Sequence, residues 1–173
     1  MNTERQFVPL RIAVLTSSDS RTEENDTSGQ LLVERLRSAG HLLHDKKIVR
    51  DDVYLIRAAL SAWIADPACN VVLTTGGTGV TGRDGTPEAA SVLFDKTIDG
   101  FGEMFRVLSY EQIKTSTLQS RALAGVANGT YIFCLPGSTS ACRMGWDTLI
   151  SAQLDFRTRP CNLVELMPRL LER

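Results

Sequence analysis

Residues 70–88 read Asn-Val-Val-Leu-Thr-Thr-Gly-Gly-Thr-Gly-Val-Thr-Gly-Arg-Asp-Gly-Thr-Pro-Glu. The first six residues form a short apolar run rich in β-branched side chains, which predicts a buried strand ending at Thr75. Thr86-Pro-Glu predicts a helix start, with a capping residue, a proline at the first helical position and an acid in the first turn. The stretch is therefore a strand, a glycine-rich loop over residues 76–85 and a helix.

The rest of the chain repeats this alternation of strand and helix. Three further strands are expected at Arg11–Thr16, at His41–Val49 and at Thr130–Leu135. Helical patterns are expected after Asp26, after Asp51 or Asp52, partly within Ile98–Ile113, after Ser138 or Thr139, and within Leu163–Leu171. The alternation predicts an α/β fold of three layers, α/β/α, with a mostly parallel sheet. No linker or repeat interrupts it, so residues 1–173 are expected to form a single domain.

Composition excludes several classes of protein. The chain has 173 residues, 43% hydrophobic and 23% charged, as in an ordinary globular protein. Its net charge of −1 gives no general attraction to nucleic acid or acidic lipid. No stretch approaches the roughly 20 apolar residues of a membrane helix, and Met1–Pro9 lacks the apolar region of a secretory signal. The four cysteines form no C-x-x-C pair and suit reduced, mostly buried positions. These features together predict a cytoplasmic protein.

The glycine-rich loop is the strongest candidate for a binding site. Ligands of a parallel sheet bind beyond the carboxyl ends of its strands, where this loop is expected. Its glycines let backbone N–H groups approach a ligand closely, and the N–H groups and the following helix attract an anion. Gly77 to Gly82 spells G-x-G-x-x-G, but a dinucleotide-binding motif opens its helix at once, and here residues 83–87 intervene. Arg83 stands where a P-loop needs lysine, so the loop is neither common phosphate motif.

Two more loops are expected at the same edge. Thr16–Arg21 is dense in hydroxyl groups, and Leu135–Ser140 places a glycine and hydroxyls at a helix start. Either loop alone suits an ordinary turn, but three such loops at one edge favour a binding site.

Carboxylates accompany these loops. Asp84 lies inside the glycine-rich loop, and Asp51 and Asp52 follow the second strand. Acids beside a phosphate-binding loop repel a polyphosphate unless a divalent cation lies between them, and Mg²⁺ is the usual cation. The alternative for Asp51 or Asp52 is that it only caps a helix.

These residues resemble the MogA/MoaB family of molybdenum cofactor biosynthesis proteins. Residues 74–89 are similar to the family's glycine-loop motif, and the similarity runs over nearly the whole chain. Further matches follow in the expected order: Asp26-Thr-Ser-Gly29, Gly100-Phe-Gly-Glu103, Leu118-Gln-Ser-Arg-Ala122 and Leu135-Pro-Gly-Ser138. Ser116–Ala122 and Thr158–Asn162 look closest to the MoaB branch.

The resemblance implies a molybdopterin-binding fold and a homo-oligomer, a trimer or a pair of trimers. It implies transfer of AMP from Mg-ATP to the terminal phosphate of molybdopterin, with release of pyrophosphate. By position, Asp51 and Asp84 match the acidic residues of active members and would hold Mg²⁺, with Asp52 as the uncertain neighbour. Further matches to the binding residues are Thr16, Ser18, Asp19, Gly76, Gly77, Thr78, Gly79, Ser120, Gly137 and Ser138.

Two alternatives to this activity remain open. The MoaB branch includes members thought to lack adenylyl transfer, so a non-catalytic molybdopterin-binding or scaffold protein is the first. A nucleotide-binding oxidoreductase, based on G-x-G-x-x-G alone, is the second. The apolar stripe Phe101, Met104, Phe105 and Leu108 suits either an oligomer interface or the core.

Overall fold

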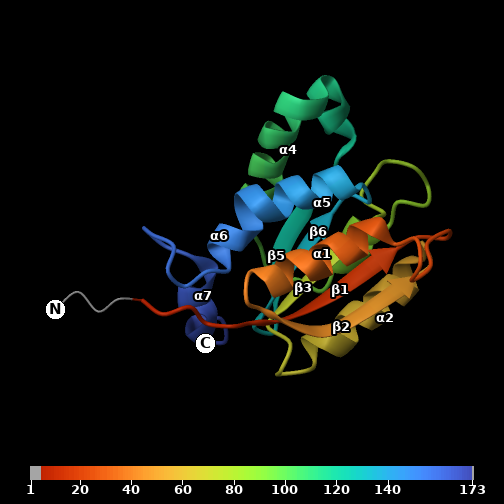
Figure 1. Ribbon diagram of the computed structural model, residues 1–173. Helices are drawn as coiled ribbons and strands as arrows, with labels where there is room; N and C mark the ends of the chain where they lie inside the picture. Colours follow the sequence, from red (N-terminus) through yellow and green to blue (C-terminus); the bar gives the residue numbers. More distant parts are fainter. Residues whose placement is uncertain (1–4, 173) are drawn as a thin grey trace.

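Six strands form one sheet in the order β2-β1-β3-β6-β5-β4 in the computed structural model (Figure 1). The structure describes residues 5–172. The strands are β1 Arg11–Ser17, β2 Leu42–Val49, β3 Val71–Thr75, β4 Lys96–Thr97, β5 Leu123–Ala127 and β6 Thr130–Leu135. Strands β2, β1, β3 and β6 are parallel, so the four predicted strands form the parallel part of the sheet.

Strands β4 and β5 form an antiparallel edge that the sequence patterns did not predict. β5 pairs with β6, and the turn between them is Asn128-Gly129, where both residues have positive φ. An Asn-Gly pair between two strands is typical of a tight hairpin turn, because both central residues tolerate that conformation. The residues of β5, Leu123–Ala127, are mostly small and include a single β-branched residue. The segment therefore lacks the composition by which a strand is recognised from sequence.

Helices cover both faces of the sheet. The helices are α1 Thr27–Ser38, α2 Val53–Ile64, α3 Thr86–Ser91, α4 Asp99–Ile113, α5 Thr139–Gly145, α6 Ser151–Gln153 and α7 Leu163–Leu166. Side chains alternate along a strand, so Ile12 and Val14 of β1 pack with α1, α4 and α5, while Ala13 and Leu15 pack with α2 and α3. Figure 1 shows α1 and α5 lying together over one face of the sheet. The three-layer α/β/α prediction is confirmed.

Irregular helical turns extend three of these helices. They are the 3₁₀ turns Lys114–Gln119 after α4 and Met167–Arg169 after α7, and the π turn Trp146–Ile150 between α5 and α6. Pro168 lies in the 3₁₀ turn after α7. The helix predicted within Leu163–Leu171 is therefore a short α-helix followed by a 3₁₀ turn.

Most predicted helix starts are correct, and one is wrong. Asp26 caps α1, Asp52 caps α2 and Ser138 caps α5, each by accepting hydrogen bonds from backbone N–H groups. Thr86 does not cap α3. It is the first helical residue after Gly85, and its hydroxyl donates 2.8 Å to the Gly76 carbonyl instead.

The apolar stripe of α4 divides between the core and the surface. Phe101 and Phe105 are buried in the core, Leu108 packs against it, and Met104 is about half exposed. Among residues 5–172, no helix is long and apolar enough to span a bilayer.

Candidate active site

The loops after the four parallel strands meet at one edge of the sheet. Strand pairing aligns Thr16 with Thr75 and Thr75 with Leu135. Beyond the strands, Gly76 N–H donates 3.0 Å to the Leu135 carbonyl, and Ser18 N–H donates 2.9 Å to the Val49 carbonyl. The glycine-rich loop is therefore hydrogen-bonded to the end of β6, and the loop after β1 is hydrogen-bonded to the end of β2.

Gly76 lets these loops approach closely. Its φ is +100°, and a Cβ there would lie 2.2 Å from the Ser17 carbonyl oxygen. A Cβ on Gly137 would lie 3.3 Å from the Gly76 Cα. The end of β1 and the loops after β3 and β6 thus pack so closely that a side chain is excluded at Gly76 and has little room at Gly137.

Asp51 faces the loop after β1. Its Oδ1 accepts a 2.7 Å hydrogen bond from the Ser17 hydroxyl, and its Oδ2 accepts one of 3.2 Å from the Asp19 N–H. Asp19 in turn accepts from the Asp51 N–H at 3.2 Å and pairs with Arg83 at 3.1 Å. This chain of contacts joins the loop after β2 to the glycine-rich loop through the loop after β1. Asp52, the alternative acid, is used as the cap of α2.

Asp84 is held within the glycine-rich loop. Its Oδ2 accepts hydrogen bonds from the Thr81 hydroxyl at 2.6 Å and from the Thr81 N–H at 2.9 Å. The pKa of Asp84 lies below its ordinary value, chiefly because the Thr81 hydroxyl bonds the ionised form, with Arg121 a smaller cause. Asp84 is therefore held as a partly exposed carboxylate.

The Thr16 side chain is buried against the N-cap of α1. Its hydroxyl donates 2.9 Å to Asp26, the fully buried cap of α1. The Lys46 ammonium lies 3.0 Å from the same Asp26 carboxylate and balances its charge. The Thr16 hydroxyl thus helps to hold the carboxylate that caps α1.

Three other predicted hydroxyls hold local structure. Ser18 accepts from the N–H groups of Ser20 and Arg21, Ser138 caps α5, and the Ser120 hydroxyl accepts weakly from the Ala122 N–H at 3.4 Å. Exposure decides which of them a ligand can reach. Ser18 and Ser120 are partly exposed and Ser138 is exposed.

The glycine-rich loop leaves backbone donors unused. Within residues 5–172, the N–H groups of Gly77 and Thr78 donate to no protein acceptor. The Thr78 side chain is buried, and its carbonyl accepts 2.9 Å from the Arg121 N–H. Backbone N–H groups of a glycine-rich loop that have no acceptor within the described chain can bind a ligand, and phosphate oxygens are suitable acceptors.

The donor set fits Mg²⁺ in part. The described part of the chain contains no group of three or more His, Cys, Asp or Glu residues that could hold a metal ion. Mg²⁺ commonly takes one or two carboxylates and completes its shell with water and substrate phosphates. The carboxylates of Asp51 and Asp84 are oxygen ligands of that kind and would serve in that way.

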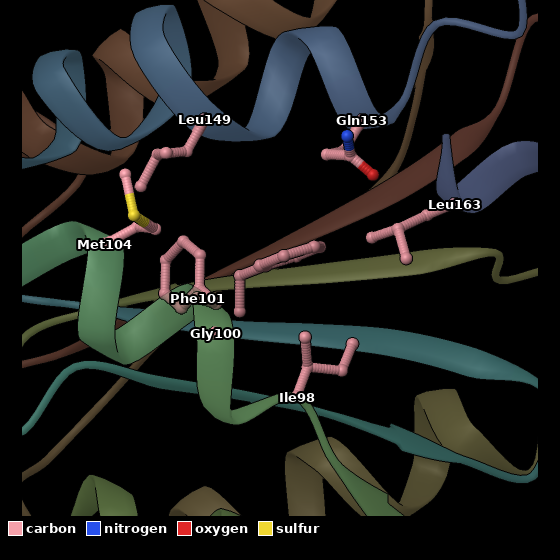
Figure 2. Close-up of a pocket in the computed structure, with 8 residues that line it drawn as sticks. Ile98, Gly100, Phe101, Met104, Leu149, Gln153 and Leu163 are labelled. Carbon is pink, nitrogen blue, oxygen red and sulfur yellow. The ribbon is translucent and has the colours of Figure 1, made fainter. Parts of the chain in front are cut away.

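Several hollows lie outside the glycine-rich loop in the described part of the chain, and two of them differ clearly in character. A polar one of about 470 Å³ adjoins the loop after β1 and includes Ser18 and Asp19 with residues 46–50 of β2 and its end. An apolar one of about 270 Å³ is lined by Phe101, Leu149 and Leu163, with Gln153 as its polar group (Figure 2). None of the predicted site residues lines the apolar hollow.

Sequence reasoning missed three residues that organise the site. Ser17 lies within the hydroxyl-rich segment Thr16–Arg21, but it is not among the residues that the resemblance assigns to the site. Arg83 and Arg121 are next to Asp84 and Ser120 in the sequence. Arg83 bonds the Asp19 carboxylate and Arg121 bonds the carbonyls of residues 79 and 84, and such contacts between distant residues leave no periodic pattern. Strand register could have suggested Ser17, since it is the residue that leaves β1 beside β2.

The chain belongs to the family described as "Probable molybdopterin binding domain", whose model matches residues 13–155. That span contains both acids and all three loops of the site.

Relatives with the same architecture support this membership. The Molybdenum cofactor biosynthesis protein B of Escherichia coli (strain K12) is 59% identical over 157 residues, 91% of this chain and 92% of the relative. A crystal structure of a Molybdenum cofactor biosynthesis protein B superposes with a TM-score of 0.87 at 40% identity, covering 98% of this chain and 100% of that one. The tungsten cofactor synthesizing protein MoaB from Pyrococcus furiosus gives a TM-score of 0.74 at 38% identity, covering 83% and 91%.

Proposed function

We propose that this protein acts in molybdenum cofactor biosynthesis by transferring AMP from Mg-ATP to the terminal phosphate of molybdopterin, with release of pyrophosphate. Family membership and the names of its relatives support the pathway. The observation that carries the reaction is that Asp51 and Asp84 lie on loops at the same edge of the sheet as the N–H groups of Gly77 and Thr78, which have no acceptor within residues 5–172.

In the proposed reaction the main role of the protein is to position the phosphate groups of the two substrates. The terminal phosphate oxygen of the pterin attacks the α-phosphorus of ATP, the new P–O bond forms, and the bond to pyrophosphate breaks. Bound Mg²⁺ would neutralise phosphate charge during this exchange. The N–H groups of Gly77 and Thr78 would bind phosphate oxygens, and the partly exposed Ser120 hydroxyl would bind the pterin substrate.

Ser17 and Asp19 would orient Asp51 rather than touch the substrates. Each donates to a different oxygen of the Asp51 carboxylate, so its direction is set before any ligand binds. Thr81 does the same for Asp84. Preorganised charge of this kind lowers a barrier more than charge that must reorient during the reaction.

A single incubation tests the proposal. The protein is mixed with molybdopterin, Mg-ATP and a pyrophosphatase, and the adenylated pterin and released phosphate are measured. We expect both products, and EDTA should abolish them. Molybdopterin binding without either product would contradict adenylyl transfer and would support the non-catalytic pterin-binding role. A stabilising effect of NAD(P) would instead support the oxidoreductase alternative.

A further inference from the structure

Arg121 contacts the glycine-rich loop at both of its ends. It lies in the short segment between the 3₁₀ turn Lys114–Gln119 and β5. Its Nε donates 2.7 Å to the Gly79 carbonyl, and its Nη2 donates 2.6 Å to the Asp84 carbonyl. Its guanidinium also forms an ion pair with Glu88 in the first turn of α3. One side chain thus bonds the loop before and after its exposed tip, Val80–Arg83.

The geometry of these contacts requires a guanidinium. Two carbonyl oxygens and a carboxylate lie around one planar group, and Arg presents five donors in a fixed fork. A lysine ammonium is a single point of charge and cannot meet the Gly79 and Asp84 carbonyls in the same directions. Arg121 is about two-thirds buried, so solvent competes only partly for its donors.

The bonded residues surround the Asp84 carboxylate. A Cβ on Gly79 would lie 2.7 Å from Asp84 Oδ2, so the Gly79 backbone packs directly against that carboxylate. Arg121 holds the Gly79 backbone on one side and the Asp84 backbone on the other. The position of the Asp84 carboxylate therefore depends on the Arg121 guanidinium.

The backbone of Arg121 also holds the adjacent residue, Ser120, near the glycine-rich loop. The Arg121 N–H donates 2.9 Å to the Thr78 carbonyl, so the segment that carries Ser120 is joined to the start of the glycine-rich loop. Ser120 and Asp84 come from segments far apart in the sequence. Arg121 is the residue whose main chain and side chain connect both.

We propose that Arg121 is a positioning residue that holds Ser120 and Asp84 at a fixed separation by tying segment 120–121 to the glycine-rich loop. This inference rests on the proposed function, in which Ser120 binds the pterin and Asp84 holds Mg²⁺. Arg121 acts through the loop and touches neither substrate. Loss of its side chain leaves the backbone bond to Thr78 but frees the Gly79 and Asp84 carbonyls, so Asp84 should move relative to Ser120.

The test compares Arg121→Lys and Arg121→Gln with two controls. Glu88→Gln removes the ion pair but leaves both carbonyl contacts, and Arg169→Gln removes an exposed pair with Glu172 near the C-terminus. Both carbonyl contacts that hold the loop remain in Glu88→Gln, and Arg169 bonds Glu172 rather than the loop, so both controls should transfer AMP within about twofold of wild type. Both Arg121 variants should require about tenfold more Mg²⁺ for half-maximal transfer and should lose at least about tenfold in kcat/KM.

Two readouts separate positioning from simple instability. Reversible unfolding lowers kcat and raises the half-saturating Mg²⁺ concentration only by the reciprocal of the folded fraction, so a tenfold rise in a variant that circular dichroism shows to be folded reports positioning. Hydrogen exchange of residues 78–85, measured without ligands, should be faster in both Arg121 variants and unchanged in the controls. Wild-type transfer by Arg121→Lys, or unchanged exchange in both Arg121 variants, would overturn the inference. If Arg121→Gln does not fold, Arg121→Lys decides.

Failure of the proposed function has a different outcome. Wild-type protein would then make no adenylated pterin, whereas exchange in residues 78–85 would still respond to Arg121. Active wild-type protein whose Mg²⁺ requirement does not change in either Arg121 variant would reject the inference and leave the proposed function standing.

Discussion

The Ser17 hydroxyl at the end of β1 donates a 2.7 Å hydrogen bond to the Asp51 carboxylate, two residues beyond the end of β2. This contact selects Asp51 over its neighbour Asp52 as the acid that faces the loops. Asp52 instead accepts from the N–H groups of Tyr54 and Leu55 at the start of α2.

Exchange of each acid for asparagine should separate these roles. We expect Asp51→Asn to lower adenylyl transfer about 100-fold or more, the size typical of losing one charge-stabilising group. Asp52→Asn should leave transfer and stability close to wild type, because asparagine caps a helix as well as aspartate does. Steady-state transfer rates and thermal unfolding measure the two effects. Equal losses in both variants would contradict the assignment.

Asp84→Asn tests the acid of the glycine-rich loop. The amide oxygen can still accept from Thr81, so the fold should survive, but the negative charge is lost. We expect transfer to fall at least about 100-fold with circular dichroism unchanged. Full activity in this variant would exclude a metal-binding role for Asp84.

Ser17→Ala tests the orientation of Asp51. A hydrogen bond to a charged group contributes roughly 1.5–3 kcal/mol, so transfer should fall about tenfold or more. Ser17→Thr keeps the hydroxyl and should retain more activity than Ser17→Ala. The ratio of kcat/KM between the two variants measures the contribution of the hydroxyl, and a ratio of one would reject it.

Two glycines of the same loop should respond differently to alanine. At Gly76 the positive φ and the approach of the Ser17 carbonyl predict that Gly76→Ala lowers the free energy of unfolding by roughly 2–5 kcal/mol. A Cβ on Gly82 would meet nothing within 4 Å, so Gly82→Ala should change stability by less than about 1 kcal/mol. Urea unfolding of both variants compares them, and similar values would contradict the predicted packing.

Thiol labelling tests the buried core around the site. Burial raises the pKa of Cys69 to about 11 and that of Cys134 and Cys142 to about 12, so these thiols stay protonated at pH 8. Cys161 is exposed. We expect one reactive thiol in the native protein and four in denaturant, with Cys161→Ser removing the native reaction. Labelling of Cys142 in the native protein would show that the loop after β6 opens.

Local patterns were enough to predict much of this molecule. The four parallel strands, the three-layer architecture and the helix starts after Asp26 and after Ser138 or Thr139 all follow from short-range periodicity and capping chemistry. Such features depend on residues a few positions apart, so a linear sequence displays them. The rule that ligands bind beyond the carboxyl ends of parallel strands then placed the candidate loops.

Contacts between distant segments required the folded chain. Asp51 and Asp52 are equivalent in sequence, and only the direction of the backbone after β2 gives one to Ser17 and the other to α2. Thr86 looks like a cap, but the returning glycine-rich loop offers it the Gly76 carbonyl instead. Arg121 acquires its role only because folding brings residues 79, 84 and 88 around it. Hydrogen bonds of this kind depend on separation in space, which no local pattern of side chains encodes.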